Sequence, residues 1–484
     1  MKILFSHSWF HRFDAKQWKT AQPYAPLGTM YAAALMRQQG HDVRIFDTMF
    51  AQNAAEILPD IESLQPDIFV IYDDGFNYLT KMCLTNMREA AFEMIRIAKE
   101  KGCMVIVSGS DSTDHFEKYL DHGADAVLLG EAEMTLKELV EQLDNNNQDF
   151  FSIPGLAFRQ NGNTIKTVRR AVMKDLDELP LPAWDLINID PYRETWMNRH
   201  GYFSINLATT RGCPFKCNWC AKPIYGNRYN SRSPENVVAE IKMLKERFHF
   251  DYIWFCDDIF GLKPGWVSRF ADLVQAENIL TKFKIQSRAD LLMQENYIAD
   301  LARAGCDNIW MGAESGSQKI LDAMDKGTML EQIYAATKLI KKHGMKPCFF
   351  IQFGYPGETR QDIEKTIRMI NTLLPHDIGI SVSYPLPGTK FYERVEAELK
   401  QKANWTDSDE LLLMFKNTYP APFYKQLHRY VHAGFHLAKT RAEIYRIAKK
   451  PQLPKREQLK KIAKIPWHLL HLIVYKQRMK SFQY

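Results

Sequence analysis

Three cysteines lie close together near the middle of the chain and could hold a metal centre. Cys213, Cys217 and Cys220 are separated by three and two residues. This spacing lets three thiolates from one loop converge on one centre. A structural zinc site normally has four closed ligands, and no neighbouring Cys or His pair supplies the fourth. A four-iron cluster with three protein thiolates leaves one iron open to a substrate or cofactor. Zinc and unligated buried cysteines are the alternatives.

The remaining cysteines are scattered singly, which is more typical of small buried side chains than of ligands. They are Cys83, Cys103, Cys256, Cys306 and Cys348. The apolar run at residues 3–5 is shorter than the roughly 7–15 residues of a secretory signal, and no stretch approaches about 18 apolar residues. Clustered cysteines in such a chain predict a reducing, cytoplasmic location.

The cysteine loop follows the first strand of a block, residues 204–385, that alternates strand and helix patterns. Strands are predicted near 205–209, 251–256, 283–287, 308–311, 347–353 and 378–383. Helices are predicted at 234–247, 265–277, 294–304, 317–324 with 330–343, and 360–373. Six such units favour a partial (β/α)6 barrel of the TIM type, with its active site at the carboxyl ends of the strands.

The first block, residues 1–145, has the alternation of a doubly wound parallel sheet, so the chain as a whole is predicted to be α/β. In such sheets ligands bind beyond the carboxyl ends of the strands. The loops after residues 6, 72, 107 and 129 are therefore the predicted wall of a pocket. None of them has the Gly-x-Gly-x-x-Gly spacing of a dinucleotide site.

Two further regions complete the chain. Residues 146–203 are predicted to be a connector with a hairpin at Asn161-Gly162. Residues 386–484 are predicted to be helical, with helices at 408–416 and 422–449 before a basic tail.

The positive charge is concentrated in that tail. The 484 residues carry a formal charge of +6, but residues 441–484 hold twelve Lys or Arg against two Glu, so the tail is +10 and the rest −4. A nucleic-acid-binding protein with a structural metal cluster is an alternative, but it predicts basic and aromatic side chains interleaved on the body. The apolar segment 466–475 with basic flanks predicts an interfacial helix, or a helix docked on the barrel with solvated lysines.

The Cys-x3-Cys-x2-Cys loop closing the first strand of a six-unit partial barrel resembles that of radical SAM enzymes, in the branch with an N-terminal cobalamin-binding domain. The resemblance covers about residues 1–395. Segments 182–186 and 232–237 are similar to the magnesium-protoporphyrin monomethyl ester oxidative cyclase group, although such segments are shared widely in the branch. The resemblance implies that the three cysteines hold a [4Fe-4S] cluster. It also implies that S-adenosylmethionine on the open iron is reductively cleaved to a 5′-deoxyadenosyl radical.

The resemblance also implies which residues contact S-adenosylmethionine, because the family places these contacts beside the third cysteine and at strand ends. They are Trp219, Asp257, Asp258, Ser287, Arg288, Glu314 and Gly354. For those that precede helices, such as Asp258, helix capping is the competing interpretation.

A second set of residues is implied to bind cobalamin, in the loops of the first block. They are Ser8, Asp73, Gly75, Ser108, Gly109, Gly130 and Glu131. The block lacks the Asp-x-His-x-x-Gly loop that supplies an axial histidine, and His7 and His11 are predicted to be polar loop residues rather than cobalt ligands. A radical SAM oxidoreductase whose first domain binds no cobalamin is therefore the alternative.

The implied reaction is methylation, or oxidative modification or cyclisation, of a carbon of an apolar substrate. The partners expected are a small-molecule or lipid-like substrate, an electron donor such as flavodoxin or ferredoxin, and no nucleic acid. Peripheral membrane contact is expected through residues 455–480, at the inner face of a cytoplasmic membrane. An iron–sulfur cluster with one open iron resembles clusters that oxygen destroys. The enzyme is therefore also expected to work under anaerobic conditions. No catalytic side chain is assigned.

Overall fold

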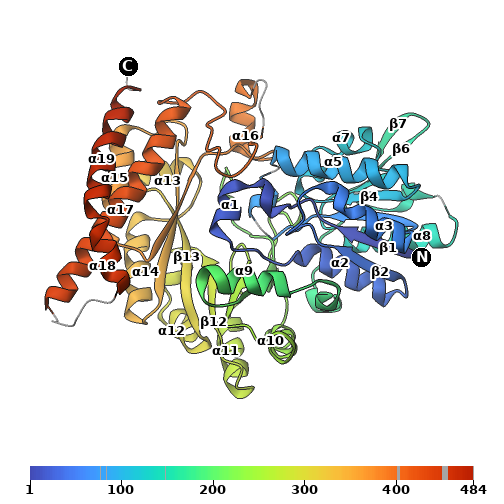
Figure 1. The fold of residues 1–484 in the computed structure, drawn as a ribbon, viewed down its shortest axis with the longest axis horizontal. Helices are drawn as coiled ribbons and strands as arrows, with labels where there is room; N and C mark the ends of the chain where they lie inside the picture. Colours follow the sequence, from blue (N-terminus) through green and yellow to red (C-terminus); the bar gives the residue numbers. More distant parts are fainter. Residues whose placement is uncertain (77, 83, 148, 400–403, 450–455, 483–484) are drawn as a thin grey trace.

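The computed structural model describes residues 1–484 except 77, 83, 148, 400–403, 450–455 and 483–484. Two sheets lie side by side, and a group of C-terminal helices lies beyond the second sheet (Figure 1). The α/β class predicted from the sequence is confirmed, with an N-terminal parallel sheet, a curled parallel sheet and a helical C-terminal region.

The N-terminal sheet has the strand order β2-β1-β3-β4-β5-β6-β7. The first five of these strands are parallel, and the hairpin β6–β7 extends the sheet in antiparallel fashion. The strands are β1 Lys2–Ser6, β2 Asp42–Phe46, β3 Ile68–Tyr72, β4 Met104–Ser108, β5 Ala126–Leu128, β6 Leu156–Gln160 and β7 Asn163–Lys166. The order reverses between β1 and β3, which is the switch point where such sheets bind ligands.

Helices cover both faces of this sheet, so every residue of the central strand β3 is buried. They are α1 Ala15–Thr20, α2 Leu27–Gln38, α3 Leu58–Leu64, α4 Tyr78–Lys81, α5 Thr85–Glu100, α6 Ser110–Asp114, α7 Phe116–Asp121 and α8 Glu133–Asp144. Helix α9 (Asp190–His200) then leads to the second sheet.

The second sheet has the order β15-β14-β13-β12-β11-β8, and each neighbouring pair is parallel. Its strands are β8 Ser204–Leu207, β11 Tyr252–Phe255, β12 Lys282–Ser287, β13 Cys306–Glu314, β14 Lys346–Phe353 and β15 Asp377–Val382. Its helices are α10 Pro234–Phe248, α11 Trp266–Ala276, α12 Glu295–Ala304, α13 Gln318–Ala323, α14 Leu330–Lys342 and α15 Arg360–Leu373. The predicted six-unit partial barrel is confirmed. A short ribbon of β9 (Thr210–Arg211) and β10 (Asn230–Ser231) brackets the cysteine loop.

The sheet side chains that face the helices form the barrel's apolar layer. Phe255 and Phe283 lie on this side and contact Phe270 of α11, with ring centroids 5.2–6.1 Å apart. The residues that alternate with them point to the concave side, and on β12 and β15 they are less buried than their neighbours. Helices therefore cover one side of the sheet only, which leaves the other side for a ligand or for the N-terminal segment.

The C-terminal region contains α16 (Lys390–Val395), α17 (Ala421–Lys449), α18 (Arg456–Ala463) and α19 (Ile465–Lys480). The helix predicted at 408–416 is wrong, because this segment has no helical assignment. Its buried residues alternate, at Leu411, Leu413 and Phe415, which is the period of an extended chain rather than a helix. In the described part of the chain, no helix combines the length and apolarity needed to cross a bilayer.

Candidate functional site

The cysteine loop begins at a buried carboxylate. Asp257, just after β11, accepts hydrogen bonds from the backbone N–H of Thr209 at 2.7 Å and of Thr210 at 2.9 Å. It also accepts one from the Thr209 hydroxyl at 2.6 Å. Burial raises the pKa of Asp257 to about 6, although these hydrogen bonds favour its charged form. The structure thus places this predicted cofactor contact where it fixes the start of the loop.

The three cysteines that follow are half-buried free thiols. Burial raises the pKa of Cys220 to about 12, and the ammonium groups of Lys222 and Lys81 act in the opposite direction. The guanidinium Nη1 of Arg288 lies 3.8 Å from the Cys217 sulfur. Cations beside thiols favour the thiolate form that binds metal. The basic side chains of Arg288, Lys222 and Lys81 near the three sulfurs fit an anionic iron–sulfur cluster.

The loop supplies three thiolates as donors. A [4Fe-4S] cluster takes each of them on a different iron and leaves one iron open. A structural zinc site takes four closed protein ligands, so the donor set matches the cluster better.

Asn218 holds the middle of the loop against two neighbouring regions of the barrel. Its backbone N–H donates to the carbonyl of Met324 at 3.1 Å, and its side-chain Nδ2 donates to that of Ala323 at 2.8 Å. The Tyr355 hydroxyl donates to its Oδ1 at 2.7 Å. These contacts come from residues that follow β13 and β14. The loop conformation therefore depends on where these two strands lie in the sheet.

Lys326 links several of the predicted S-adenosylmethionine contacts. Its Nζ donates to Glu314 Oε1 at 2.8 Å and lies 5.9 Å from the centre of the Trp219 ring. Its carbonyl accepts a hydrogen bond from Arg288 Nη2 at 2.9 Å. The indole N–H of Trp219 is buried with no partner among the described residues. An unpartnered donor and a group of charged side chains beside the cysteines fit a polar cofactor.

The sequence did not single out Lys326, because nothing in its local pattern marks a lysine that follows a short helix as part of a site. The remaining predicted contacts lie in different settings. Asp258 forms an ion pair of 2.7 Å with Lys81 of the N-terminal α4, and Ser287 is buried at the end of β12. Gly354 is placed against the C-terminal region, where Asn417 donates to its carbonyl at 2.6 Å.

The predicted cobalamin residues at the switch point are brought together. Asp73 accepts hydrogen bonds from the Ser8 backbone at 2.7 Å and the Ser8 hydroxyl at 3.0 Å, and its own N–H donates to the carbonyl of Ser108 at 2.8 Å. A Cβ on Gly109 would lie 2.9 Å from that of Asp73. The neighbouring Ser110 hydroxyl is buried and has no partner among the described residues. A close backbone approach beside an unpartnered hydroxyl fits a polar ligand.

The other three predicted cobalamin residues meet the barrel domain. A Cβ on Gly75 would lie 3.2 Å from the Tyr225 hydroxyl, and one on Gly130 would lie 3.5 Å from the Ile224 carbonyl. Glu131 pairs with Arg211, just before the cysteine loop, at 2.5 Å. The edge of the N-terminal sheet and the cysteine-loop region therefore share one interface.

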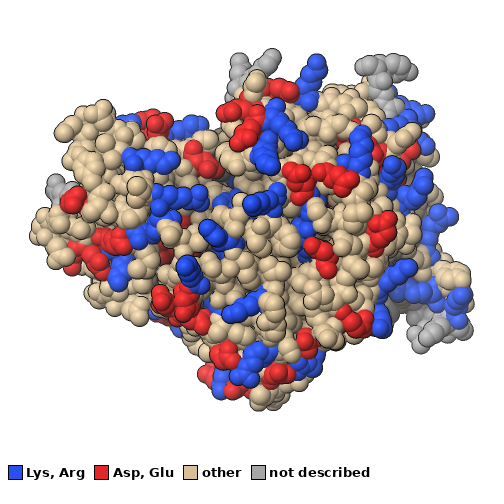
Figure 2. Space-filling model, turned by 180° about the vertical axis from the view of Figure 1, so that it is seen from behind, with Lys and Arg blue, Asp and Glu red and all other residues tan. Residues whose placement is uncertain are grey.

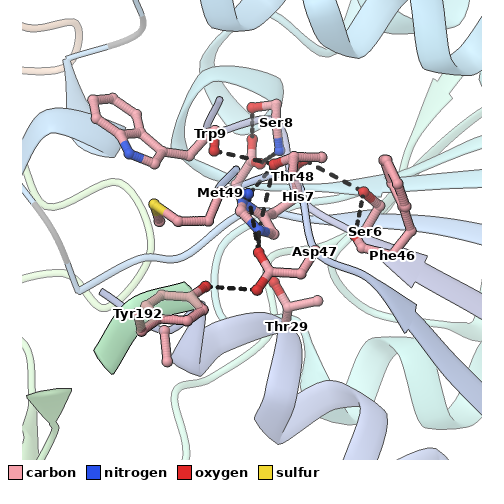
Figure 3. Close-up of polar contacts among 12 residues, drawn as sticks. Ser6, His7, Ser8, Trp9, Thr29, Phe46, Asp47, Thr48, Met49 and Tyr192 are labelled. Carbon is pink, nitrogen blue, oxygen red and sulfur yellow. Dashed lines mark hydrogen bonds and ion pairs between the residues drawn. The ribbon is translucent and has the colours of Figure 1, made fainter. Parts of the chain in front are cut away.

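His7, also at the end of β1, is part of a buried polar cluster (Figure 3). Its Nε2 lies 2.9 Å from Asp47, whose other oxygen accepts a hydrogen bond of 2.6 Å from Tyr192 of α9. Its Nδ1 lies 3.1 Å from the Thr48 hydroxyl. Burial alone would raise the pKa of Asp47, but the bonds from His7 and Tyr192 hold it below its usual value. Both ring nitrogens thus have protein partners.

Four of the five scattered cysteines are buried free thiols: Cys103, Cys256, Cys306 and Cys348. Cys83 lies outside the described residues.

Comparison with known proteins relates these two sites to known families. Residues 207–370 match the radical SAM superfamily, and residues 19–140 match the B12 binding domain. The chain is a radical SAM enzyme with a B12-binding domain. The resemblance drawn from the sequence is confirmed, and with it the cofactors: a [4Fe-4S] cluster, S-adenosylmethionine and cobalamin.

Relatives of this radical SAM enzyme include methyltransferases and cyclases. An uncharacterized methyltransferase of Pyrococcus horikoshii is 29% identical over 387 residues, which cover 78% of this chain and 80% of that protein. The anaerobic magnesium-protoporphyrin IX monomethyl ester cyclase of Rubrivivax gelatinosus is 24% identical over 405 residues, covering 82% and 70%. The fold is similar to that of the cobalamin-dependent S-adenosylmethionine radical enzyme OxsB. That match has a TM-score of 0.74, 16% identity, and coverage of 98% of this chain and 72% of that one.

Proposed function

We propose that this enzyme is a cobalamin-dependent radical SAM methylase of an apolar small molecule. The observation that supports this best is the shared interface, where Gly75 and Gly130 of the B12-binding domain lie against Tyr225 and Ile224 of the barrel domain. A methyl carrier and a radical generator must both reach one substrate carbon, and this arrangement brings their predicted binding edges together.

When bound, the reduced cluster supplies the electron that cleaves S-adenosylmethionine to a 5′-deoxyadenosyl radical, and cobalamin supplies a methyl group. In this proposal Cys213, Cys217 and Cys220 hold the cluster, and Arg288 and Lys326 orient the carboxylate and ribose of S-adenosylmethionine. Asp257 holds the start of the loop through Thr209 and Thr210. Because these groups are fixed by hydrogen bonds before the cofactor binds, little reorganisation is needed at the site.

The products of S-adenosylmethionine separate methylation from the cyclase-type alternative that the Rubrivivax relative suggests. Anaerobically purified protein, reconstituted with iron, sulfide and hydroxocobalamin, is incubated with dithionite and S-adenosylmethionine. A methylase is expected to form both 5′-deoxyadenosine and S-adenosylhomocysteine, because one molecule remethylates the corrinoid. Formation of 5′-deoxyadenosine alone supports the oxidative or cyclising reaction. Formation of neither product contradicts a radical SAM activity.

The predicted cobalamin edge is testable through Gly109. In Gly109→Ala the new methyl group would lie 2.9 Å from Asp73 Cβ, so the hydrogen bonds between Asp73 and Ser8 must shift. We expect this variant to retain several-fold less cobalamin after gel filtration, with unchanged iron content. Gly434→Ala makes the same change in α17, where the new Cβ would lie at an ordinary 3.7 Å from Leu472. Equal retention by both variants would place the corrinoid elsewhere.

The proposal includes an external electron donor, such as flavodoxin or ferredoxin, because the cluster must receive one electron for each cleavage. Lys216, in the cysteine loop, is exposed and offers a contact for an acidic donor.

We further propose that the C-terminal helices contact an anionic membrane surface. Trp467, Leu470 and Ile473 of α19 are 53%, 59% and 58% exposed, respectively. Figure 2 shows Lys and Arg side chains along the edge of the molecule that these helices form. The basic residues of α18 and α19 and between them whose side chains the structure describes are Lys460, Lys461, Lys464, Lys476, Arg478 and Lys480. Each cation near an anionic surface contributes about 1 kcal/mol, and exposed apolar side chains add their burial in the interface.

The membrane proposal is tested with the double variant Leu470→Ser/Ile473→Ser. Both side chains point to solvent, so the fold should tolerate the change. We expect co-sedimentation with phosphatidylglycerol vesicles to fall several-fold relative to the unchanged protein, and little binding to phosphatidylcholine vesicles. The control is Leu280→Ser, because Leu280 is 56% exposed on the barrel. Binding that is the same in all three proteins would show that α19 is not a membrane contact.

A further inference from the structure

The concave side of the barrel sheet is not packed like a barrel core. Along β12 the side chains facing the helices, Phe283 and Ile285, are almost fully buried, whereas Lys284 between them is partly exposed. On β14 the concave side is mixed: Phe350 is 36% exposed, whereas Cys348 and Gln352 on the same side are buried. In complete barrels the interior is filled by layers of side chains. Here part of the inner layer is accessible.

Part of this concave surface is covered by the N-terminal segment. The backbone of Ala25 exchanges two hydrogen bonds of 2.8 Å with the side chain of Asn206 on β8. The Tyr24 ring lies edge-on to that of Trp254 on β11, with centroids 5.8 Å apart. This segment covers the β8–β11 side of the surface, and the inner faces of β12 to β15 extend beyond it.

The uncovered part presents flat rings. Trp310 of β13 and Phe350 of β14 stack with centroids 4.8 Å apart and planes 28° apart. The neighbouring residue on β15 is Gly379, where a Cβ would lie 3.3 Å from Trp310 and 3.4 Å from Phe350. The absence of a side chain at Gly379 leaves room for both rings. A stacked pair of partly exposed aromatic rings offers an apolar surface on which a flat molecule can stack.

The side chain of Lys284 also lies on this surface. The Nζ of Lys284 is 4.8 Å from the centre of the Trp254 ring, and over the described residues no ion pair includes it. The carboxylates at the amino ends of these strands are Asp307, which pairs with Lys346 at 2.8 Å, and Asp377, which is exposed. Burial lowers the pKa of Lys284 to about 8, so it still carries a proton at neutral pH. A partly buried ammonium without a carboxylate is complementary to an anionic ligand.

The distance along β12 from Lys284 to the predicted cofactor contacts can be derived from the sequence. Arg288, which contacts Cys217, is four residues further along the same chain segment. At about 3.3 Å per residue, four residues correspond to roughly 13 Å. A molecule anchored at Lys284 must therefore be long enough to carry its reacting carbon from there to the strand ends.

We propose that the surface formed by Lys284, Trp310 and Phe350 binds the substrate, and that the substrate is a carboxylic acid with a flat apolar body. The carboxylate pairs with Lys284, the body stacks on the rings, and the far end reaches the carboxyl ends of the strands. This inference rests on the proposed function, because it names the substrate class of the same reaction.

The test compares two probes that share a flat ring system, 1-pyrenebutyrate and the neutral 1-pyrenebutanol. Binding to the anaerobically reconstituted holoenzyme is followed at pH 7 by pyrene fluorescence anisotropy. We expect the acid to bind about tenfold more tightly than the alcohol, since tenfold corresponds to about 1.4 kcal/mol and a charge-assisted pair supplies that much. In Lys284→Met the acid should lose its higher affinity, while the alcohol should bind as it does to the unchanged protein. The control Lys338→Met, on the exposed face of α14, should retain the higher affinity for the acid.

Several outcomes would overturn the proposal: equal affinity for acid and alcohol, no binding of either probe, or a preference for the acid that survives Lys284→Met. Iron–sulfur absorbance of each variant shows whether the barrel is intact. Formation of 5′-deoxyadenosine by the unchanged protein is measured in the same preparation. If that activity is present and the acid preference is absent, this inference alone fails. If 5′-deoxyadenosine is not formed, the proposed function fails.

Discussion

Replacing Cys217 by alanine is expected to abolish cluster assembly and reductive cleavage of S-adenosylmethionine. The three thiolates come from one loop, and two remaining sulfurs cannot hold a cubane that needs three protein ligands. The Arg288 guanidinium, 3.8 Å from the Cys217 sulfur, would also lose the negative charge that it is placed to meet. Iron and sulfide content and 5′-deoxyadenosine formation under dithionite measure the effect, which should reduce both below detection.

The matched control for this change is Cys306→Ala. Cys306 is a buried free thiol on β13 of the same barrel, and its sulfur makes a weak 3.8 Å hydrogen bond to the carbonyl of Asn308. We expect this variant to keep its cluster and to lose only the modest stability of a shortened core side chain. Cleavage of S-adenosylmethionine that survives Cys217→Ala would show that the cluster is not held by this loop.

Replacing Arg211 by methionine is expected to destabilise the protein by about 3–5 kcal/mol, because it leaves two buried carboxylates without their cationic partner. Arg211 pairs with Glu131 at 2.5 Å and with Glu133 at 2.7 Å, and all three side chains are buried between the domains. Its guanidinium also lies 5.2 Å from the Tyr225 ring centre. Equilibrium unfolding in urea at pH 7 measures the loss.

The loss of stability in Arg211→Met is expected to depend on pH. Burial raises the pKa of Glu131 even in the presence of Arg211, and loss of the cation would raise it further. A folded-state pKa above the unfolded value means that the ionised carboxylate opposes folding, and this cost disappears as the pH falls and the group takes up a proton. The deficit of Arg211→Met should therefore be smaller at pH 5 than at pH 7.

Arg269→Met is the control for the ion pair, because Arg269 and Glu235 are both more than half exposed. Exposed pairs contribute about 0–1 kcal/mol. If Arg211→Met costs no more than Arg269→Met, then the buried pairs do not stabilise the domain interface.

Much of the barrel could be predicted from the sequence, because each strand and helix has a local pattern of apolar residues. Five of the six strands begin and end within two residues of their predicted bounds, and β13 extends beyond its predicted bounds by two residues at one end and three at the other. The helix predicted at 408–416 failed for a local reason as well. Its leucines resemble a helical apolar face, but Ser408 donates hydrogen bonds to Asp14, 394 residues away, and the left-handed backbone of Leu411 interrupts a right-handed helix.

The sequence by itself determined the position of the cysteine loop and the strand that precedes it. Three thiolates separated by three and two residues lie in one short loop, so they can meet without any contact from a distant part of the chain. Only the tertiary structure decided which residues surround that loop. Lys326 joins Glu314 and Arg288, Lys81 reaches Asp258 from the other domain, and Asp257 turns back to Thr209. These partners depend on strand register and on how the two domains dock. No local sequence pattern predicts contacts of that kind, because they join residues that are far apart in sequence.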